Sequence, residues 1–579
     1  MISGARMALH THDKFSKPQG AAMTTAPNPN PTLGARSGGR ILIDQLLCQG
    51  VARVSCVPGE SYLAALDALY GSPIDVLVCR AEGGAAMMAE ACGKLTGRPG
   101  VCFVTRGPGA TNACHGVHIA MQDSTPMILF IGQVDRGMRE REAFQEIDFK
   151  SMFGGLCKWV VEIDRAARIP ELVARAFRVA MQGRPGPVVV SLPEDMLTET
   201  AQVADAARVE PALGAPSAAD MARLGELLAG AERPIAVLGG SGWDAAAHRS
   251  IAQFAARWQL PVATSFRRAA LFDADHPCYA GEIGIGPDPR LKARLAEADL
   301  LLLIGGRLSE MPSQSYTLLG VPTPAQRLVH VHPGAEEIGR VYQPTLGILS
   351  TPRAFAALLA GLTPPAAPVA WDGAAAQAHA DYVAWSEVPR VLPGEFQYGQ
   401  AIAWLRGRLP HDSIVCNGAG NYAGWLNRHY RFHEFGTQLA PTSGSMGYGV
   451  PAAVWAKRQF PDRTVVAFAG DGCFLMNGQE FATAVQYGIA IVVVVVDNGR
   501  YGTIRMHQDR DYPGRVVATD LRNPDFAAYA MAFGGHGERV ACTEDFAPAF
   551  ERALASGKPA ILHCRLDPRA QSHGRDSTA

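Results

Sequence analysis

Residues 464–500 read TVVAFAGDGCFLMNGQEFATAVQYGIAIVVVVVDNGR. This stretch contains two apolar runs, Thr464–Ala469 and Ile489–Val496, and the second consists almost entirely of β-branched residues. Both runs are too short to cross a bilayer and too apolar for edge strands, so they indicate buried parallel strands. The first run ends at Gly470-Asp471-Gly472, where two glycines flank a carboxylate. Backbone can therefore come close to a ligand at this strand end.

A helix is predicted between the two strands. Asn477, with Glu480 three residues later, has the spacing of a capping box, which predicts a helix from Asn477 to about Tyr487. A strand, a helix and a parallel strand bring the chain back to the same edge of the sheet. We therefore expect Asp471 and Asn498 to lie side by side. One carboxylate and one amide oxygen suit Mg²⁺, a hard cation that prefers oxygen ligands and keeps phosphate oxygens among them.

The same stretch resembles the fingerprint of thiamine diphosphate enzymes, in which a GDG loop is followed, after about one βαβ unit, by a residue pair ending in Asn. The resemblance implies that Asp471, Asn498 and the backbone carbonyl of Arg500 bind Mg²⁺. The sequence departs from the family at Asp497, where the family usually has Asn, but the implied ligand is the next residue. For the GDG alone, an ordinary doubly wound strand and loop is the alternative. The implied cofactor contacts in these loops are Asp471, Gly472, Cys473, Asn498, Tyr501 and Gly502.

Length and composition limit the class of protein. A chain of 579 residues predicts three or four domains with large cores. The formal net charge of −1 does not indicate nucleic acid or an anionic membrane as a partner. The 12 cysteines are scattered without metal-binding spacing, which indicates reduced core residues of a cytoplasmic protein. No stretch reaches the length of a membrane helix, and the amino terminus lacks the apolar core of a secretion signal.

Repeated strand, loop and helix units predict an α/β fold of three doubly wound parallel-sheet domains. Residues 1–39 are rich in Pro, Ala, Asn, Thr and Gly without periodicity, so they are predicted to form a disordered tail. The three domains are expected at residues 40–200, 220–363 and 395–567. Linkers rich in Ala and Pro are expected at 201–219 and 364–394, and a short tail at 568–579.

The first domain carries a carboxyl group at a strand-to-helix junction. Glu82 is followed by small residues that leave room for a flat ligand, and the next strand ends in the loop Arg106–Asn112, which reads RGPGATN. This segment resembles the pyrimidine-binding domain of the acetolactate synthase branch of thiamine diphosphate enzymes. The resemblance implies that Glu82 bonds N1′ of the cofactor's aminopyrimidine, an acid–base role that prepares removal of the proton at thiazolium C2. A capping charge at a helix start is the alternative.

Residues 441–453 read PTSGSMGYGVPAA and resemble the family's GxMGxGxPAA loop. The resemblance implies that Met446 is the apolar wedge beneath the bent cofactor, and its polarizable, unbranched side chain fits an irregular gap. Simple core filling is the alternative. Further implied cofactor contacts are Ser445, Gly420, Asn421 and Tyr422, and the family more often has Gln-His at the last two positions.

Four residues are candidates for substrate contact. The resembled branch places the Phe and Gln of an AFQE run and a later Lys near the substrate, which here are Phe144, Gln145 and Lys158. Core packing for Phe144 and a solvated face for Lys158 are the alternatives. His507 stands near the position where biosynthetic acetolactate synthases carry a Trp, so the acceptor preference stays open. A lone histidine is also commonly a surface residue.

The sequence leaves FAD binding open. Acetolactate synthases hold a flavin in the central domain, and Gly305-Gly306-Arg307 is consistent with that. Val329–Pro333, however, reads VHVHP where the group usually has an Asp-containing strand end. Strands that end in glycine without a full GxGxxG are weak indicators of a dinucleotide.

The resemblance extends from Arg40 to about Asp567 and implies decarboxylation of a 2-oxo acid such as pyruvate, followed by carboligation. It also implies a homodimer or homotetramer with active sites between subunits, and it leaves a regulatory subunit open. A related carboligase, lyase or 2-oxo acid decarboxylase is the nearest alternative. Family decarboxylases typically carry a His-His pair, whereas two residues separate His115 from His118. A flavin oxidase and a non-catalytic regulatory paralogue are more distant, and an intact cofactor site disfavours the latter.

Overall fold

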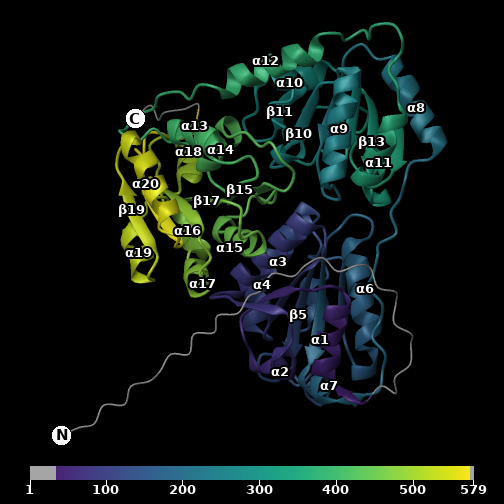
Figure 1. Ribbon diagram of the computed structural model, residues 1–579, viewed down its shortest axis with the longest axis vertical. Helices are drawn as coiled ribbons and strands as arrows, with labels where there is room; N and C mark the ends of the chain where they lie inside the picture. The colour runs from purple at the N-terminus through teal and green to yellow at the C-terminus, as the bar shows by residue number, and fades with distance from the viewer. Residues whose placement is uncertain (1–33, 574–579) are drawn as a thin grey trace.

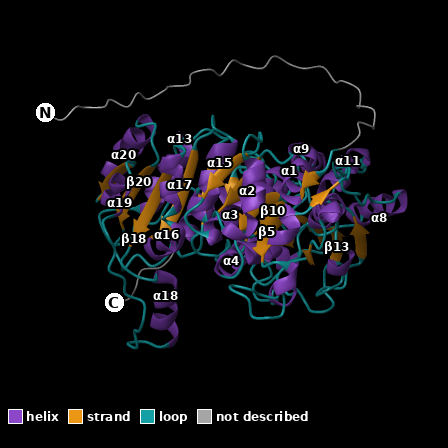
Figure 2. Ribbon diagram, turned by 90° about the horizontal axis from the view of Figure 1, so that it is seen from below, coloured by secondary structure: helices purple, strands orange, loops and turns teal. Residues whose placement is uncertain are grey.

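The computed structural model describes residues 34–573, and these residues form three lobes (Figure 1). Each lobe is built on a six-stranded sheet. Every pair of neighbouring strands in the three sheets is parallel. Helices cover both faces of the sheets (Figure 2). The predicted fold class, three doubly wound α/β domains, is confirmed.

The amino-terminal sheet has the strand order β3-β2-β4-β5-β7-β6. Its inner strands β4, β5 and β7 are buried along their whole length, which is why they are continuous apolar runs. The strands are β2 (Arg53–Cys56), β3 (Asp75–Val78), β4 (Gly100–Val104), β5 (Met127–Gln133), β6 (Trp159–Glu162) and β7 (Pro187–Pro193). The helices are α1 (Gly38–Cys48), α2 (Leu63–Leu69), α3 (Glu82–Thr96), α4 (Pro108–Asp123), α5 (Phe149–Phe153), α6 (Ile169–Met181) and α7 (Glu194–Thr198).

The central sheet has the order β11-β10-β9-β12-β13-β14. Its strands are β9 (Pro234–Leu238), β10 (Val262–Ser265), β11 (Tyr279–Ile283), β12 (Leu300–Ile304), β13 (Arg327–His332) and β14 (Leu346–Leu349). The helices of this lobe are α8 (Ala218–Ala229), α9 (Ala245–Trp258), α10 (Pro289–Glu297), α11 (Pro352–Leu358) and α12 (Ala374–Ser386).

The carboxy-terminal sheet has the order β16-β15-β17-β18-β20-β19, with the two apolar runs of residues 464–496 at its centre. Its strands are β15 (Ile414–Asn417), β16 (Gln438–Leu439), β17 (Val465–Gly470), β18 (Val492–Asp497), β19 (His536–Val540) and β20 (Ala560–Arg565). The helices are α13 (Tyr398–Arg408), α14 (Tyr422–His429), α15 (Gly449–Gln459), α16 (Asp471–Asn477), α17 (Glu480–Gln486), α18 (Gly502–Asp511), α19 (Phe526–Ala532) and α20 (Thr543–Ala555).

The helix predicted from Asn477 to about Tyr487 is wrong in its start. Helix α16 begins at Asp471 and ends at Asn477, and α17 begins only at Glu480. Neither Asn477 nor Gln479 caps a helix, because no side chain bonds the first amides of α17. The carboxylate of Glu480 instead bonds backbone amides of the amino-terminal domain.

Three predicted segment boundaries also differ from the structure. The tail predicted at 1–39 lies partly outside the described residues, but Arg36–Ser37 forms β1, which pairs antiparallel with β8 (Thr200–Ala201). The linker predicted at 364–394 contains α12, whose Tyr382 packs its ring edge against Tyr279. The tail predicted at 568–579 is packed as far as residue 573, with Ala570 buried. These segments gain order from contacts that composition does not reveal.

The amino- and carboxy-terminal lobes share one hydrophobic core. Buried residues of α3 and α4 belong to the same apolar cluster as those of α15, β17 and β18. Helix α3 packs directly on α15 (Figure 1). Inside this interface the Tyr448 hydroxyl donates to Glu90, and Lys94 pairs with Asp123. Most of the central lobe's core lies in separate clusters.

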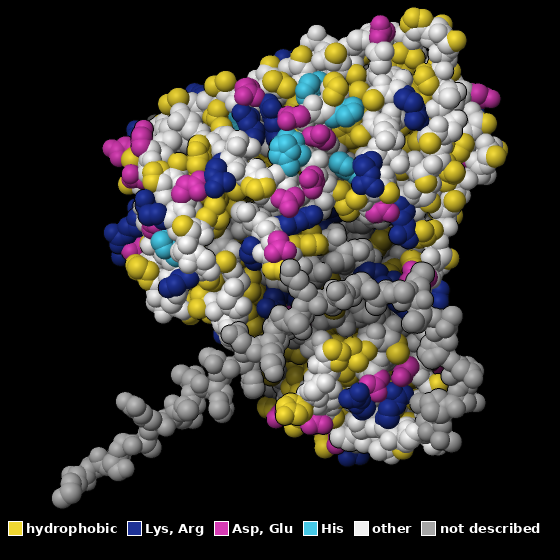
Figure 3. All heavy atoms as spheres, in the orientation of Figure 1, with side chains coloured by type: hydrophobic (Ala, Val, Ile, Leu, Met, Phe, Trp, Pro, Cys, Tyr) yellow, Lys and Arg dark blue, Asp and Glu magenta, His cyan; other side chains and the backbone are white. Residues whose placement is uncertain are grey.

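The surface carries charges of both signs. On the face in Figure 3, acidic, basic and histidine side chains are interspersed rather than gathered by sign. Two ion pairs join the central and carboxy-terminal lobes: Arg431 binds Asp275 at 3.1 Å, and His433 Nδ1 lies 3.0 Å from Asp273. Among residues 34–573, no helix is both long and apolar enough to cross a membrane.

Candidate active site

The two loops singled out in the sequence follow neighbouring strands. β17 and β18 are parallel and adjacent, with Gly470 opposite Val496. Asp471 is therefore the first residue after β17, and Asn498 the first after β18, at the same carboxyl edge of the sheet. The predicted adjacency of these strands is confirmed. In open α/β sheets this edge is where ligands bind.

Asp471 is a buried carboxylate without a cationic partner among the residues that the structure describes. Its side chain is 3% exposed, and its Oδ1 accepts a hydrogen bond from the amide of Gly472 at 2.9 Å. Its Oδ2 accepts from Asn523 Nδ2 at 2.7 Å. Burial raises the pKa of Asp471 to about 6, because removal from water disfavours the charged form. A bound cation would reverse this effect.

Residues 34–573 contain no cluster of three or more His, Cys, Asp or Glu side chains arranged to hold a metal ion. A cation beside Asp471 would therefore take amide, backbone carbonyl and diphosphate oxygens as its other ligands, which suits Mg²⁺. In the neighbouring loop, Asn498 Oδ1 accepts from the Arg500 amide at 3.2 Å, which folds the residues after β18 into a turn.

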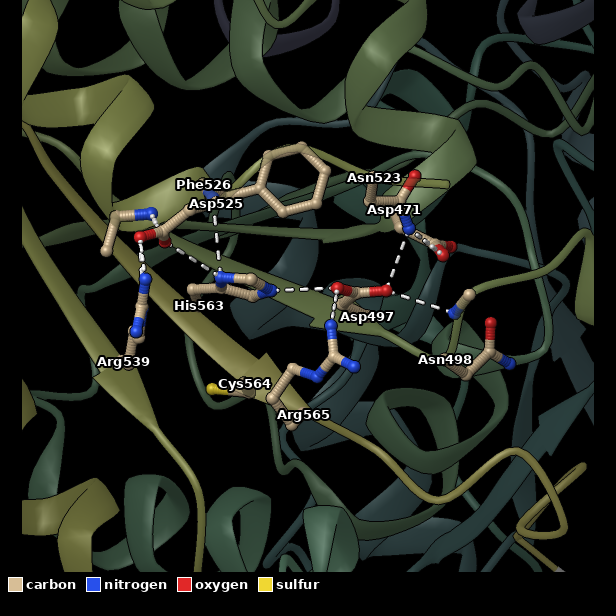
Figure 4. Close-up of polar contacts among 12 residues, drawn as sticks. Asp471, Asp497, Asn498, Asn523, Asp525, Phe526, Arg539, His563, Cys564 and Arg565 are labelled. Atoms are coloured by element: carbon tan, nitrogen blue, oxygen red, sulfur yellow. Dashed lines mark hydrogen bonds and ion pairs between the residues drawn. The ribbon is translucent and has the colours of Figure 1, made fainter. Parts of the chain in front are cut away.

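Behind these loops lies Asp497, the position at which the sequence departs from the family (Figure 4). Asp497 is 1% exposed, and its Oδ2 lies 2.8 Å from His563 Nε2 and 2.7 Å from Arg565. Burial alone would raise its pKa, but the hydrogen bonds from His563 and Asn523 and the charge of Arg565 hold the pKa of Asp497 well below its usual range. Asp497 therefore stays ionised.

The predicted cofactor contacts form a close-packed cradle around the loop of Asp471. A Cβ on Gly472 would lie 2.5 Å from the Tyr501 ring, and one on Gly502 would lie 2.9 Å from Asn498 Nδ2. A side chain at either position would displace the Tyr501 ring or the Asn498 amide. On the other side, the Tyr422 hydroxyl lies 3.4 Å from the Cys473 sulfur.

The loop that carries Met446 approaches the same cradle. Met446 is half-buried against the shared core, and its neighbour Ser445 has its hydroxyl 2.6 Å from His115 Nε2 on α4. The amide of Gly447 donates to the Cys473 sulfur at 3.3 Å. The loop of Met446 is thus bonded both to the loop of Asp471 and to the amino-terminal lobe. Gly420, with a φ of +146°, begins the turn into Asn421 and α14.

Glu82 is the first residue of α3, and residues 79–81 connect it to the end of β3. It is half-buried, and its Oε2 accepts from Asn112 Nδ2 at 3.0 Å. The turn in front of it is held by the other lobe, because Glu480 Oε1 accepts from the amides of Arg80 and Ala81 at 2.9 Å each. The following small residues are required there: a Cβ on Gly84 would lie 2.6 Å from Glu480 Oε1.

Three family models match in succession along this chain. The amino-terminal thiamine pyrophosphate binding domain matches residues 36–152, the central domain of these enzymes matches 221–359, and the carboxy-terminal binding domain matches 418–564. The chain belongs to the thiamine pyrophosphate enzyme family. The carboxy-terminal match contains Asp471 and Asn498, and the amino-terminal match contains Glu82.

Similar proteins of this family cover nearly the whole chain. The acetolactate synthase isozyme 2 large subunit of Escherichia coli (strain K12) is 31% identical over 92% of this chain and 96% of its own length. The acetolactate synthase large subunit of Parasynechococcus marenigrum (strain WH8102) is 32% identical over 91% and 87%. The acetolactate synthase of Bacillus subtilis (strain 168) is 28% identical over 94% and 96%.

Within this thiamine pyrophosphate enzyme the substrate candidates are dispersed. Phe144 is 72% exposed. Gln145 packs against Gly107, and the backbone of Gln145 has a φ of +63°. Lys158 precedes β6, so it lies at the amino edge of the sheet, opposite to the edge that carries Glu82. Its amine donates to the Gln182 carbonyl at 2.6 Å, and burial lowers the pKa of Lys158 to about 8. A single chain does not bring Lys158 together with the other candidates.

His507, in contrast, lines a cavity of about 1060 Å³ between the central lobe, α4 and the loops of the carboxy-terminal lobe. The cavity also reaches Asn421 and the buried arginines Arg267 and Arg268. Unpartnered buried polar atoms point to a polar ligand in this enzyme, because such atoms are rare in folded proteins. Among the described residues, those at the cavity are Arg267 Nε, Tyr342 OH, Asn427 Oδ1, Ser443 Oγ, His507 Nδ1 and His573 Nδ1.

Sequence reasoning missed Asn523, His563, Glu480 and the segment up to His573. Asn523 lies in an irregular loop, and its contact with Asp471 has no sequence signal. The capping-box spacing did single out Glu480, but it indicated Asn477 as the partner. Glu480 instead bonds the amides of Arg80 and Ala81. The carboxy-terminal segment reaches the cavity because Asn421 Nδ2 donates to the Gln571 carbonyl at 2.8 Å. No periodic pattern predicts such a contact.

Proposed function

We propose that this chain catalyses the thiamine diphosphate- and Mg²⁺-dependent decarboxylation of a 2-oxo acid such as pyruvate and joins the resulting acyl unit to a second carbonyl compound. The proposal follows the similarity to acetolactate synthases over almost the whole chain. The observation that carries it is Asp471, a buried carboxylate with no cationic side-chain partner among the described residues, in a loop next to that of Asn498 in the thiamine pyrophosphate binding domain.

The residues present fit both groups. Asp471, Asn498 and the carbonyl of Arg500 would hold Mg²⁺, with the diphosphate between the metal and the glycine-lined cradle. Bound thiamine diphosphate supplies an electron sink for acyl-anion chemistry at neutral pH. Glu82 holds a proton at the aminopyrimidine, and Asn112 orients its carboxyl group. Met446 supports the cofactor from the apolar side.

The active unit is a homodimer or homotetramer, in which Glu82 of one subunit serves the cofactor held by another. Exposed apolar side chains support this. Leu475 and Met476 on α16 are each 46% exposed, directly after the metal-side loop. A second copy of the chain would remove this surface from water. Size-exclusion chromatography with light scattering measures the assembly, and a monomer with full activity would contradict it. The same measurement of assembly mass, made on protein isolated without overexpression, tests whether a regulatory subunit is bound.

The cavity that His507 lines is the proposed site for a flavin. Arg267 is 4% exposed, and its Nη1 donates to the Pro441 carbonyl at 2.6 Å. Its Nε has no hydrogen-bond partner among residues 34–573, so the cavity wall offers a buried cation with an unused donor. Arg268 lies beside it. An anionic, polar molecule such as FAD suits these groups. His330, however, occupies the strand end with its Nε2 2.9 Å from the Gly306 carbonyl. Visible absorption of the purified protein tests flavin directly.

The decisive experiment incubates purified protein with thiamine diphosphate, Mg²⁺ and a panel of 2-oxo acids, with mass detection of products. Consumption of a 2-oxo acid with formation of an acyloin or acetohydroxy acid supports the proposal. An aldehyde as the sole product would show that the chain is a simple 2-oxo acid decarboxylase. An acyloin without any acetohydroxy acid would indicate a related carboligase or lyase on the same cofactor. A cofactor-loaded protein that converts no 2-oxo acid would contradict it. The matched control is Asp471→Asn, which keeps the shape and removes the charge.

A further inference from the structure

One side-chain amide joins two carboxylates behind the candidate metal site. Asn523 Nδ2 donates to Asp471 Oδ2 at 2.7 Å and to Asp497 Oδ1 at 2.8 Å (Figure 4). Asn523 comes from the loop between α18 and α19, and neither carboxylate is near it in sequence. Both amide hydrogens of Asn523 are therefore used, one on Asp471, which follows β17, and one on Asp497, which ends β18.

The orientation of this amide is determined by its partners. An amide oxygen in the position of Nδ2 would face two carboxylate oxygens at less than 3 Å, as the two distances above show. Only the NH₂ group can face them, because it carries two donors and the carboxylates carry none. The Asn523 oxygen points away and has no partner among the described residues.

Asp497 is in turn anchored from the neighbouring strand β20. His563 Nε2 and Arg565 lie at 2.8 Å and 2.7 Å from its Oδ2, and the Gly499 amide donates to its Oδ1 at 3.0 Å. His563 is 4% exposed, and its Nδ1 lies 3.3 Å from Asp525 Oδ1. Asp497 thus has a fixed position that does not depend on a metal ion.

We propose that Asn523, held in place by Asp497, is a positioning residue for the divalent cation. A carboxylate offers about four lone-pair positions on its two oxygens. The Gly472 amide takes one on Oδ1 of Asp471, and Asn523 takes one on Oδ2. The remaining lone pairs are then directed at the cation before it binds. This role rests on the proposed function, because it concerns the metal of that site.

Asp497 explains why the departure from Asn in the family pattern is compatible with a metal site. Asp497 Oδ1 accepts from Asn523 and from the Gly499 amide, and its Oδ2 is in contact with His563 and Arg565. The protein thus already occupies the lone pairs of this second carboxylate, so it does not compete for the cation. Groups behind a metal ligand typically change metal affinity 10–100-fold when they are removed.

The test is a Mn²⁺ titration of protein saturated with thiamine diphosphate, followed by electron paramagnetic resonance, which reports free Mn²⁺ without any turnover. We expect Asn523→Ala to weaken Mn²⁺ binding roughly 10–100-fold. Asn523→Leu keeps the volume without a donor and should behave alike. The matched control is Arg522→Ala in the same loop, which should bind Mn²⁺ as the unaltered protein does. Excess Mg²⁺ should restore the turnover of Asn523→Ala.

The outcomes separate this inference from the proposed function. If the unaltered protein binds no Mn²⁺ with thiamine diphosphate present, the proposed metal site itself fails. If the unaltered protein binds Mn²⁺ and both Asn523 variants, folded by circular dichroism, bind it equally well, Asn523 has no positioning role. Loss of binding that excess metal does not restore would indicate a structural role instead, and would overturn the inference.

Discussion

The carboxylate of Glu480 accepts hydrogen bonds from the amide of Ala81, the residue immediately before Glu82, and from the amide of Arg80. Glu480 begins α17 of the carboxy-terminal lobe. Glu82 begins α3 of the amino-terminal lobe. The side chain is fully buried, and Thr483 donates to its other oxygen at 2.7 Å. One carboxylate therefore links the carboxy-terminal lobe of a chain to the turn that positions Glu82 in the amino-terminal lobe of the same chain.

Removal of that carboxylate should disturb both lobes. Glu480→Ala leaves two partly buried amides without acceptors, a cost of up to roughly 1–3 kcal/mol for each. We expect a thermal midpoint lower by several degrees together with slower turnover. Glu480→Gln is the matched control, since its amide oxygen can still accept from Arg80 and Ala81 and its NH₂ can face Thr483. Equal behaviour of the two variants would show that the charge, rather than the link, is what matters.

Glu82→Gln should keep the fold but slow turnover by roughly 10²–10⁴, the usual effect of a positioned acid or base. Gln still accepts from Asn112, so the helix start is preserved. The measurement is kcat with saturating thiamine diphosphate, alongside the cofactor's dissociation constant. Unchanged kcat would remove Glu82 from the mechanism.

Chelation of Mg²⁺ should release the cofactor. Without a cation, the diphosphate would face the carboxylate of Asp471, and like charges repel at this distance in a buried site. Gel filtration in excess chelator, followed by assay of thiamine in the protein fraction, measures the loss. Full retention of cofactor and activity in chelator would count against the metal assignment.

Asp123 should make the assembly of the lobes sensitive to acid. Burial would raise its pKa, but the charges of Lys94 and Arg268 and a hydrogen bond from Thr442 outweigh burial and lower the pKa of Asp123 below its ordinary value of 3.8. A group with a lowered pKa stabilises the fold above its unfolded pKa, and this stability is lost as pH falls through the folded pKa. The thermal midpoint should therefore fall as pH drops below about 4.

Asp123→Asn tests this prediction. The variant leaves Lys94 with Glu90 as its remaining acidic partner, so we expect a loss of about 3 kcal/mol at neutral pH. Its midpoint should also depend less on pH between 3 and 5, roughly the range in which carboxyl groups titrate. Asp462→Asn, at an exposed position, is the control. A parallel pH dependence in Asp123→Asn and the unaltered protein would refute the assignment.

Much of the candidate site follows from local pattern. The apolar runs of β17 and β18 could only be buried parallel strands, and the geometry of a strand, helix and parallel strand then places Asp471 beside the loop of Asn498. Glycines at 472 and 502 allow the close approach of Tyr501 and Asn498, so their presence in the sequence was informative. The start of α17 was misplaced because Glu480 bonds the amides of Arg80 and Ala81 instead of forming a capping box with Asn477.

The sequence by itself therefore determined the three parallel sheets, the family and the edge at which the cofactor loops meet, because strand periodicity and glycine spacing are local properties. Only the tertiary structure decided that Asn523 joins Asp471 to Asp497, that Glu480 holds the turn before Glu82, and that Lys158 lies at the far edge of its sheet. These contacts join residues far apart in the chain through irregular loops, whose paths depend on the packing of whole lobes rather than on any neighbouring residue.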